Sequence, residues 1–403
     1  MSESIQYADP LAQKLPTIVA LNAVSAIAQL AQMGIVYPLI ALWLADKNIS
    51  ASEIGLVGSA QWVGMLFGIL YAPQLMYLSK ARTIVIFGCV GSGVAALLMP
   101  WIPATSIVLW CAAAAVFGFG IGLRWIGNES WLYSIISGEQ RGRVVGIHET
   151  LIHLAQVIGP LLIAWIGIAS GNIFYLGAAV AVMALLPLFW ADIPMQNAAD
   201  HRPNSVKSFL LGMLRDVKHI FGIRIGFIAG VVDGVLFGML AVYEVNSGAS
   251  TERAALVMTV FGIGGLLASA PLGWLSDKYG TRAASISCAL TGIAGALMLW
   301  VGPQWLHWPA VFFLGAVAAC MLTLSIIAGT EQAAREQKNM SAAMSEISIA
   351  FTLGTIIGPV MAGAAMDIWG LWTFPAISLL LSVTVLLLNT GASLDKPLTS
   401  HQK

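Results

Sequence analysis

Charged residues are scarce in this chain of 403 residues, where Asp, Glu, Lys and Arg together make up 9%. An average soluble domain contains about 25% charged residues, and a soluble protein of this length could not cover its surface with so few. The scarcity therefore excludes a cytosolic enzyme and a secreted domain. The balance of 19 basic against 19 acidic residues also excludes a nucleic-acid-binding protein, which would need a basic patch. Most of the chain must face lipid.

Cysteine is also rare, and all four cysteines lie inside apolar stretches without the spacing of a metal site. We interpret them as small hydrophobic residues and expect no metal and no cofactor. The chain has no G-x-x-x-x-G-K-[ST] motif, so ATP is not the direct energy source. No nucleophile and base stand at a fixed spacing, so an enzyme is not expected. No short apolar segment with a cleavage site precedes the first long apolar stretch, and we expect no removable signal peptide.

Long segments without Asp, Glu, Lys or Arg, such as residues 83–123, 150–191 and 283–330, predict membrane-spanning helices. One spanning helix needs about 20 apolar residues, and lipid permits only helices or closed barrels. The alternating pattern of barrel strands is absent. We therefore predict twelve spans, near residues 15–45, 51–78, 83–102, 105–137, 142–168, 172–192, 219–246, 253–276, 283–302, 308–334, 339–367 and 371–390.

The two halves of the chain resemble one another. Ala72-Pro73 matches Ala270-Pro271, and Ile158-Gly159-Pro160 matches Ile357-Gly358-Pro359, at offsets of 198 and 199 residues. Six spans in each half make the repeats parallel, related by an axis along the membrane normal. The predicted fold is an all-α membrane protein with two pseudo-symmetric six-helix bundles, residues 1–192 and 219–403, joined by a cytoplasmic linker at 193–218.

Basic residues indicate the orientation in the membrane. With the N-terminus inside, 16 of the 19 basic residues are cytoplasmic or at that interface, Lys47 and Arg253 are outside, and Arg124 is within the membrane. This distribution follows the positive-inside rule. We expect cytoplasmic N- and C-termini, in a multi-pass protein of a bacterial inner membrane, and a monomer with the lipid bilayer as its surroundings.

The segment 273–282 reads Gly-Trp-Leu-Ser-Asp-Lys-Tyr-Gly-Thr-Arg. It resembles the G-x-x-x-D-[RK]-x-G-x-[RK] loop of the major facilitator superfamily, and Gly159-Pro160 resembles the fifth-span motif of that family. The resemblance covers nearly the whole chain. In finer detail the chain is similar to the bacterial YcaD-like branch, through Pro38-Leu39 to Trp43-Leu44, Glu129, Arg141-Gly142-Arg143 and Pro271 to Arg282. The resemblance implies the major facilitator fold, with two bundles that rock about a site at the membrane midplane.

The same resemblance implies gating residues. Asp277, with Arg282, would meet the cytoplasmic start of the fifth span beside Arg141 and Arg143 and act as a conformational latch. A carboxylate is favourable at a helix N-terminus and near arginine. The alternative is an ordinary cytoplasmic charge.

Titratable residues at membrane depth are the candidates for proton coupling, because such residues are costly unless they face a cavity or a partner. Glu149, His153 and Gln156 share one face of the fifth span, and a histidine near a carboxylate can hold a proton near neutral pH. Glu129 enters the membrane from the same turn and reaches a similar depth, where two carboxylates could share a proton. The alternative is that these groups only hold helices together.

Polar residues elsewhere in the spans are candidates for substrate binding. Arg124 stays charged, so it either binds an anionic substrate group or is the counter-ion of Asp233, which is itself a candidate proton site. The other candidates are uncharged or aromatic and come from four spans: Asn22, Gln29, Trp125, Gln156, Thr352 and Thr355. Thr352 and Thr355 occupy the repeat-related positions of His153 and Gln156.

These observations predict a secondary active transporter of a small organic solute that is coupled to protons. The resemblance to the family implies that it works by alternating access and favours efflux. Protonation can drive such a cycle only if it changes the relative stability of the two states. The alternatives are an uncoupled facilitator and a transport-like membrane sensor. The residues leave open the identity and charge of the substrate.

Overall fold

The computed structural model describes residues 10–136, 138–195, 221–335 and 340–391. Within these ranges, only the backbone is described at residues 10–13, 138–142, 221–222, 330–335, 340–345 and 389–391. The predicted linker at 193–218 lies outside the described residues from position 196 onward.

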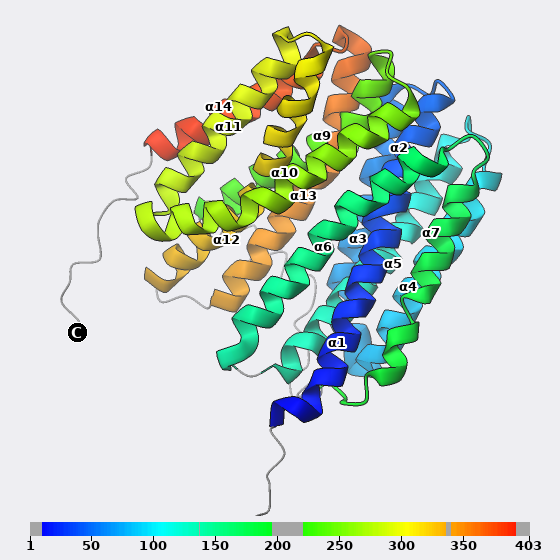
Figure 1. Ribbon diagram of the computed structural model, residues 1–403, viewed down its shortest axis with the longest axis vertical. Helices are drawn as coiled ribbons and strands as arrows, with labels where there is room; N and C mark the ends of the chain where they lie inside the picture. Colours follow the sequence, from blue (N-terminus) through cyan, green and yellow to red (C-terminus); the bar gives the residue numbers. More distant parts are fainter. Residues whose placement is uncertain (1–9, 137, 196–220, 336–339, 392–403) are drawn as a thin grey trace, which may run out of the picture.

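The first half consists of helices that cross the molecule in alternating directions (Figure 1). They are α1 (Pro10–Gln29), the π-helix η1 (Leu30–Val36), α2 (Tyr37–Asp46), α3 (Ala51–Leu78), α4 (Ala81–Leu98), the short η2 (Met99–Trp101), α5 (Ile107–Ile135), α6 (Gly138–Ile166), α7 (Asn172–Met183) and η3 (Leu186–Trp190).

The second half repeats this arrangement. It contains α9 (Phe221–Asn246), α10 (Thr251–Tyr279), α11 (Thr281–Val301), the short η4 (Gln304–Leu306), α12 (His307–Arg335), α13 (Met340–Trp369) and α14 (Thr373–Gly391). Among the described residues, eleven helices are long and apolar enough to span a membrane, and Thr373–Leu388 is a shorter apolar helix. The all-α prediction is confirmed, and the predicted spans lie within a few residues of the observed helices.

The helix starts also repeat. Ser50 caps α3, where its hydroxyl accepts from the Glu53 amide and the Glu53 carboxylate accepts from the Ser50 amide. Ser250 caps α10 in the same way by accepting from the Arg253 amide. Such caps satisfy backbone N–H groups that a helix start leaves unpaired. Each cap fixes the residue at which the second long helix of its half begins.

Helix packing follows one pattern in both halves. In the first half α3 packs on α5, α4 on α5 and α7, and α6 on η1. In the second half α10 packs on α12, α11 on α12 and α14, and α13 on α9. Contacts between the halves are paired as well, because α3 meets α13 and α10 meets α6. The equivalent pairs are consistent with the predicted pseudo-symmetry.

The hydrophobic core shows where the halves meet. One cluster contains residues of both halves, including Tyr37, Ile54, Phe237 and Phe261. A second cluster, which includes Ile18 near the start of α1, contains only first-half residues. Ile223, Ile347 and Ala350, near the starts of α9 and α13, form a third cluster from the second half alone. In the described chain the halves therefore share a core toward one end and have separate cores at the starts of α1 and α9.

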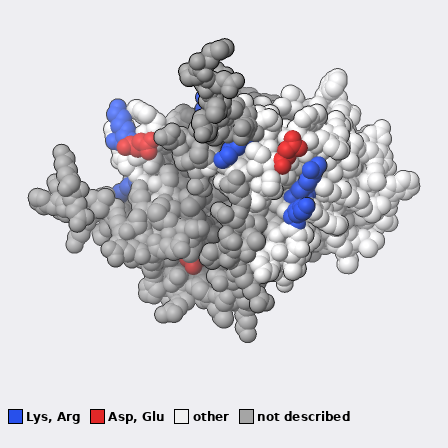
Figure 2. All heavy atoms as spheres, turned by 90° about the horizontal axis from the view of Figure 1, so that it is seen from below, with Lys and Arg blue, Asp and Glu red and all other residues white. Residues whose placement is uncertain are grey.

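We call these ends the closed end and the basic end. At the closed end α2 passes to α3 and α13 ends. At the basic end α3 passes to α4 and α10 passes to α11, and Figure 2 looks onto this end, with Lys and Arg side chains in view. The described basic residues at these turns and helix starts are Lys80, Arg82, Arg143, Arg224, Lys278 and Arg282.

Candidate functional site

Arg124 is the centre of a buried polar network in the first half. Its side chain is 1% exposed. Its Nη2 donates to Oε1 of Gln29 at 3.1 Å and of Gln32 at 2.8 Å, and its Nε donates to Gln32 Oε1 at 3.1 Å. Gln32 Nε2 in turn donates to the Ser92 hydroxyl at 2.6 Å. The network joins the first span to α4 and α5.

The expected ion pair between Arg124 and Asp233 is wrong. Arg124 bonds to neutral glutamine oxygens of its own half, and it makes no ion pair with any described residue. The amide dipoles of Gln29 and Gln32 supply the acceptors that a buried guanidinium needs. With its guanidinium fully enclosed, Arg124 is also out of reach of a solute in this conformation, so its predicted role in substrate binding stays a prediction for another state.

A second polar group lies nearer the basic end and includes a buried histidine. His148, fully buried, has its Nδ1 3.1 Å from Asn22 Oδ1 and its Nε2 3.7 Å from Glu129 Oε1. The Glu129 side chain is 20% exposed. Asn22 and His148 are both buried, so neither side chain is accessible to a solute in this conformation. The sequence analysis named Asn22 and Glu129 as separate candidates, and the structure brings them together at His148.

Glu149 follows His148 on α6 and is exposed. It lies within electrostatic reach of Glu129, His148 and His153. The His153 ring hydrogen-bonds the backbone carbonyl of Glu149 at 2.8 Å, not its carboxylate. The carboxylate is therefore free of hydrogen bonds to the part of the chain that the structure describes, and it can exchange protons with water.

The helix face that bears Glu149 turns toward the second half. Gln156, two turns further along this face, is partly exposed, and its carbonyl oxygen approaches Gly262 of α10. A Cβ atom built at Gly262 would lie 3.0 Å from that oxygen. Helix α6 thus contacts α10 of the second half at Gln156, which shares a helix face with Glu149 and His153.

The candidate site residues of the second half differ in how far they are exposed. Asp233 is partly exposed on α9, whereas Thr352 and Thr355 are buried. The Thr352 hydroxyl donates to the Ser348 carbonyl, and the Thr355 hydroxyl donates to the Thr352 carbonyl, both within α13. Their role in substrate binding stays a prediction that this geometry does not favour. Trp125 is partly buried, with the Arg124 guanidinium 5.9 Å from its ring centre.

At the closed end Asp367, near the end of α13, binds the start of α3. Its two carboxylate oxygens accept from the Ala51 amide at 3.0 Å and the Ser52 amide at 2.7 Å. A carboxylate is stabilising at a helix N-terminus because it meets unpaired N–H groups and the positive end of the helix dipole. We call this contact the Asp367 clamp. The sequence analysis missed it, since the partners are 315 or 316 residues apart.

The gating residues predicted at the basic end are not joined in the same way. Asp277 is exposed and forms no hydrogen bond or ion pair with a described residue, and Arg143 is exposed. The Arg141 side chain lies outside the described set. Arg282 has an interaction of its own. The predicted latch is therefore not formed through Asp277 in this conformation, in which the closed end is clamped.

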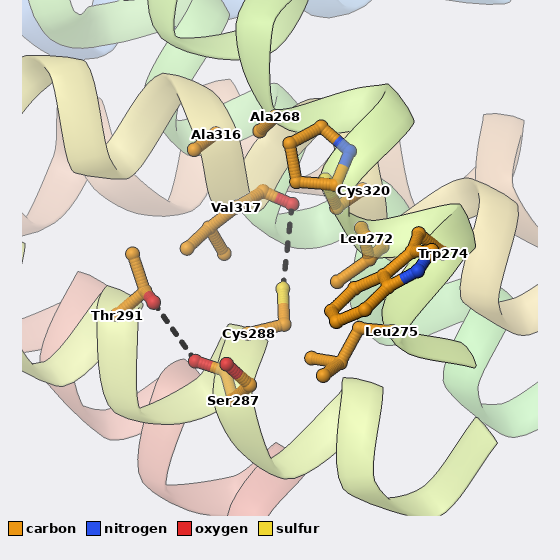
Figure 3. A pocket seen from close by; sticks show the side chains of 11 residues that line it. Ala268, Leu272, Trp274, Leu275, Ser287, Cys288, Thr291, Ala316, Val317 and Cys320 are labelled. Atoms are coloured by element: carbon orange, nitrogen blue, oxygen red, sulfur yellow. Dashed lines mark hydrogen bonds between the residues drawn. The ribbon is translucent and has the colours of Figure 1, made fainter. Parts of the chain in front are cut away.

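One well-defined cavity lies away from these polar groups. Figure 3 shows it between α10, α11 and α12, where it encloses about 300 Å³. Its lining includes Trp274, Cys288 and Thr291 and no charged side chain. The Thr291 hydroxyl donates to the Ser287 carbonyl. The cavity therefore lies within the second half alone and is lined mainly by apolar side chains.

No three His, Cys, Asp or Glu side chains in the described ranges come close enough to hold a metal ion. The arrangement is instead that of a membrane transporter, with two six-helix halves, a shared core toward one end and titratable side chains at membrane depth. The chain belongs to the major facilitator superfamily, whose family model matches residues 23–251 and 225–402. This is a family of transporters and not of enzymes.

Several relatives share this assignment. The "Uncharacterized MFS-type transporter YcaD" of Escherichia coli O45:K1 is 24% identical over 342 residues, which cover 83% of this chain and 85% of that one. Its counterpart in Escherichia fergusonii is also 24% identical, over 344 residues. These matches confirm the resemblance to the YcaD-like branch.

Among solved structures, the chain is similar to a variant of the nucleoside transporter NupG, with a TM-score of 0.76 and 12% identity over 93% of this chain and 99% of that chain. A second NupG structure gives a TM-score of 0.68 and 14% identity over 94% and 97% of the two chains. Identities this low establish the fold alone, and the fold is that of the superfamily.

Proposed function

We propose that this transporter is a proton-coupled secondary active transporter of a small organic solute, which works by alternating access and favours efflux. The basic end would be cytoplasmic, in the inner membrane of a bacterium, as the positive-inside rule predicts and as relatives from Escherichia support. In that orientation the structure corresponds to a state that is closed outside.

The proposal rests on the surroundings of Glu149. This carboxylate is exposed on a helix face that turns toward the other half, and a buried histidine and a second carboxylate, Glu129, are close by. A carboxylate beside a second carboxylate is favoured in its protonated form, and a histidine can carry a proton near neutral pH, so a group of these residue types is suited to hold a proton. Adding that proton changes the charge on the face that closes when the halves approach, so it changes the relative stability of the two states.

The test is transport in proteoliposomes. A compound that raises the thermal stability of the purified protein is selected from a panel of metabolites and drugs at two pH values. Its transport is then measured with and without an imposed pH gradient. We expect the gradient to drive accumulation by the wild type, and we expect Glu149→Gln to retain equilibration and lose accumulation.

Asp46→Asn is the matched control, because Asp46 is exposed at the closed end and its ion pair is with Lys47. It should accumulate the compound like the wild type. Equal accumulation by Glu149→Gln and wild type would remove Glu149 from coupling. A wild type that only equilibrates the compound would identify an uncoupled facilitator, in which the His148 and Glu129 contact serves packing.

A further inference from the structure

Asp233 is the one partly exposed residue in a long buried stretch of α9. All the remaining residues from 229 to 244 are buried, whereas part of the Asp233 surface is accessible. The carboxylate has no hydrogen bond or ion pair to a described residue. A carboxylate at the middle of a spanning helix is costly unless it faces water or a partner. The accessible part of Asp233 is therefore where this side chain can meet water or a polar partner.

Four aromatic side chains, each 5–6% exposed, pack together on the closed-end side of Asp233. Phe237 is one helical turn beyond Asp233, and its ring stacks on Tyr37 with centroids 4.9 Å apart. Phe261 stacks on Phe237 at 6.1 Å, and Trp62 meets Tyr37 edge-on at 6.2 Å. The rings come from α2, α3, α9 and α10, so both halves contribute to them. We call these four residues the aromatic roof.

The aromatic roof also holds a hydrogen-bond donor close to Asp233. The Tyr37 oxygen accepts from Trp62 Nε1 at 3.1 Å. Its own O–H proton has no acceptor in the described structure, and the oxygen lies against Gly238 of α9, 3.1 Å from where a Cβ atom would be. A solute that enters between Asp233 and the roof would therefore meet a carboxyl group, a hydroxyl donor without an acceptor, and aromatic rings.

The approach to this place runs from the basic end. On α1 the accessible residues Val19, Ala23 and Ala26 recur at helical spacing, and Leu30 at the start of η1 is also partly accessible. The stripe ends there, because residues 31–40 are all buried. Because α9 runs from the basic end toward the closed end, Asp233 lies on the basic-end side of Phe237. The stripe and Asp233 are thus on the open side of the roof.

We infer that Asp233 and the aromatic roof form the substrate site, and that the substrate is a planar, nitrogen-containing aromatic solute that presents an N–H group or a positive charge to the carboxylate. This inference rests on the proposed function as a transporter of small organic solutes. Rings favour other rings in stacked or edge-on geometry and attract cations. An unpaired carboxylate favours a charged or N–H partner and repels anions.

The two sources of this chemistry are a neutral nucleoside and a cationic aromatic amine, and binding to the purified protein in lipid nanodiscs distinguishes them. The probes are adenosine, ethidium, benzoate and glucose, each titrated by calorimetry at one ionic strength. We expect at least one of adenosine and ethidium to bind, with benzoate and glucose at least about tenfold weaker, since a charge-assisted hydrogen bond is worth that much. Adenosine alone would indicate a nucleoside, and ethidium alone would indicate a cation.

Single variants measure separately how much the Asp233 carboxylate and the aromatic roof contribute to binding. Asp233→Asn should weaken the bound probe at least about tenfold, and Phe237→Leu should weaken it through the lost ring contact while leaving the preference over benzoate. Asp46→Asn should bind like the wild type. Thermal unfolding of each variant checks its fold, and Asp233→Glu replaces Asp233→Asn if the latter does not fold, with an expected weakening from the displaced carboxylate.

Wild-type affinity in both the Asp233 and the Phe237 variants would overturn the inference, as would preferential binding of benzoate or glucose, or binding of none of the planar probes. Glu149→Gln keeps this result apart from the coupling proposal. If Glu149→Gln binds the probe like the wild type, and the pH gradient has no effect on transport by the wild type, the proposal of proton coupling is wrong and the proposed substrate site is supported. If the pH gradient drives accumulation but Asp233→Asn binds the probe like the wild type, the proposed substrate site is wrong and the proposal of proton coupling is supported.

Discussion

Arg124 shows how a single charged residue can be buried in a spanning helix without an ionic partner. Its Nε and Nη2 donate three hydrogen bonds to Gln29 and Gln32, and both glutamines are themselves at most 1% exposed. The desolvation cost of the charge is offset by amide oxygens that are already held in position. The arginine and the two glutamines are therefore one structural unit, and neither part is stable in this core without the other.

Replacement of Arg124 by methionine should destabilise the protein, because two buried glutamine oxygens would lose their donors at about 1–3 kcal/mol each. Arg124→Lys should lie between this variant and the wild type, since an ammonium cannot reproduce the forked donor geometry. Thermal unfolding in detergent measures the effect. Arg82→Met, which changes an exposed arginine at the basic end, is the control. Equal midpoints for Arg124→Met and Arg82→Met would contradict a structural role for this network.

At the residue scale, the sequence predicted which side chains were unusual better than it predicted their partners. An ion pair with Asp233 was one of the two roles predicted for Arg124, but the helix packing places Arg124 against glutamines of its own half. Thr352 and Thr355 were assigned to binding, yet a threonine hydroxyl in a helix can bond to its own backbone carbonyls, as both do. Side-chain partners depend on packing that no single span encodes.

At the scale of helices, close packing depends on glycines placed at equivalent positions of the two halves. A Cβ atom on Gly64 or Gly118 would collide with the backbone carbonyl of Ala115 or Gln61 in the partner helix. In the second half the corresponding collisions are between Gly264 and the Phe312 carbonyl, and between Gly315 and the Phe261 carbonyl. Small residues let helix backbones approach in lipid, and the repeat preserves this approach between α3 and α5 and between α10 and α12.

Gly118→Ala and Gly315→Ala should therefore each lower thermal stability, because the obstructing atom is backbone and cannot rotate away. Gly91→Ala is the matched control, since Gly91 lies on α4 with nothing within 4 Å of the added carbon. Alanine is a better helix former than glycine by about 0.5–1 kcal/mol, so the control should be neutral or stabilising. A loss of stability as large in Gly91→Ala as in Gly118→Ala would attribute the effect to something other than helix approach.

Hydrophobicity and turn residues predicted where the helices lie, but not their internal irregularities. The first span was expected as residues 15–45, and the structure places a π-helical segment at Leu30–Val36 within it. The Tyr37 amide bonds to the Gln32 carbonyl, five residues back. Such a segment shifts the phase of the helix and is frequent at functional sites. The π-helical segment lies between Gln29, which belongs to the Arg124 network, and Tyr37, which belongs to the aromatic roof. A count of apolar residues along the chain could not predict this segment.

At the scale of the whole molecule, the two ends of the bundle differ in what holds the halves together. The Asp367 clamp and the shared core lie toward the closed end, whereas Asp277 at the basic end is exposed. If the halves rock as rigid bodies, opening of one end must accompany closing of the other. The Asp367 clamp then contributes to the relative stability of the two states, and weakening it should shift their populations without any change at the substrate site.

Asp367→Asn tests this coupling between the ends. The amide keeps one acceptor oxygen and loses the charge, so we expect a loss of about 1 kcal/mol and a roughly fivefold shift of population toward the state that is open at the closed end. Spin labels at Val108 and Val301 report on the closed end, and labels at Leu78 and Tyr279 report on the basic end. All four positions are exposed, and the four cysteines are first replaced by serine.

In pulsed distance measurements, Asp367→Asn should add a longer distance between positions 108 and 301 and a shorter one between positions 78 and 279. Asp192→Asn, an exposed change at the basic end, should leave the closed-end distances unchanged. A reciprocal change is the signature of two bodies that rock about a common centre. Identical distributions in Asp367→Asn and wild type would show that the clamp does not bias the states. Lengthening at both ends together would show that the halves separate instead of rocking, which is incompatible with alternating access in this protein.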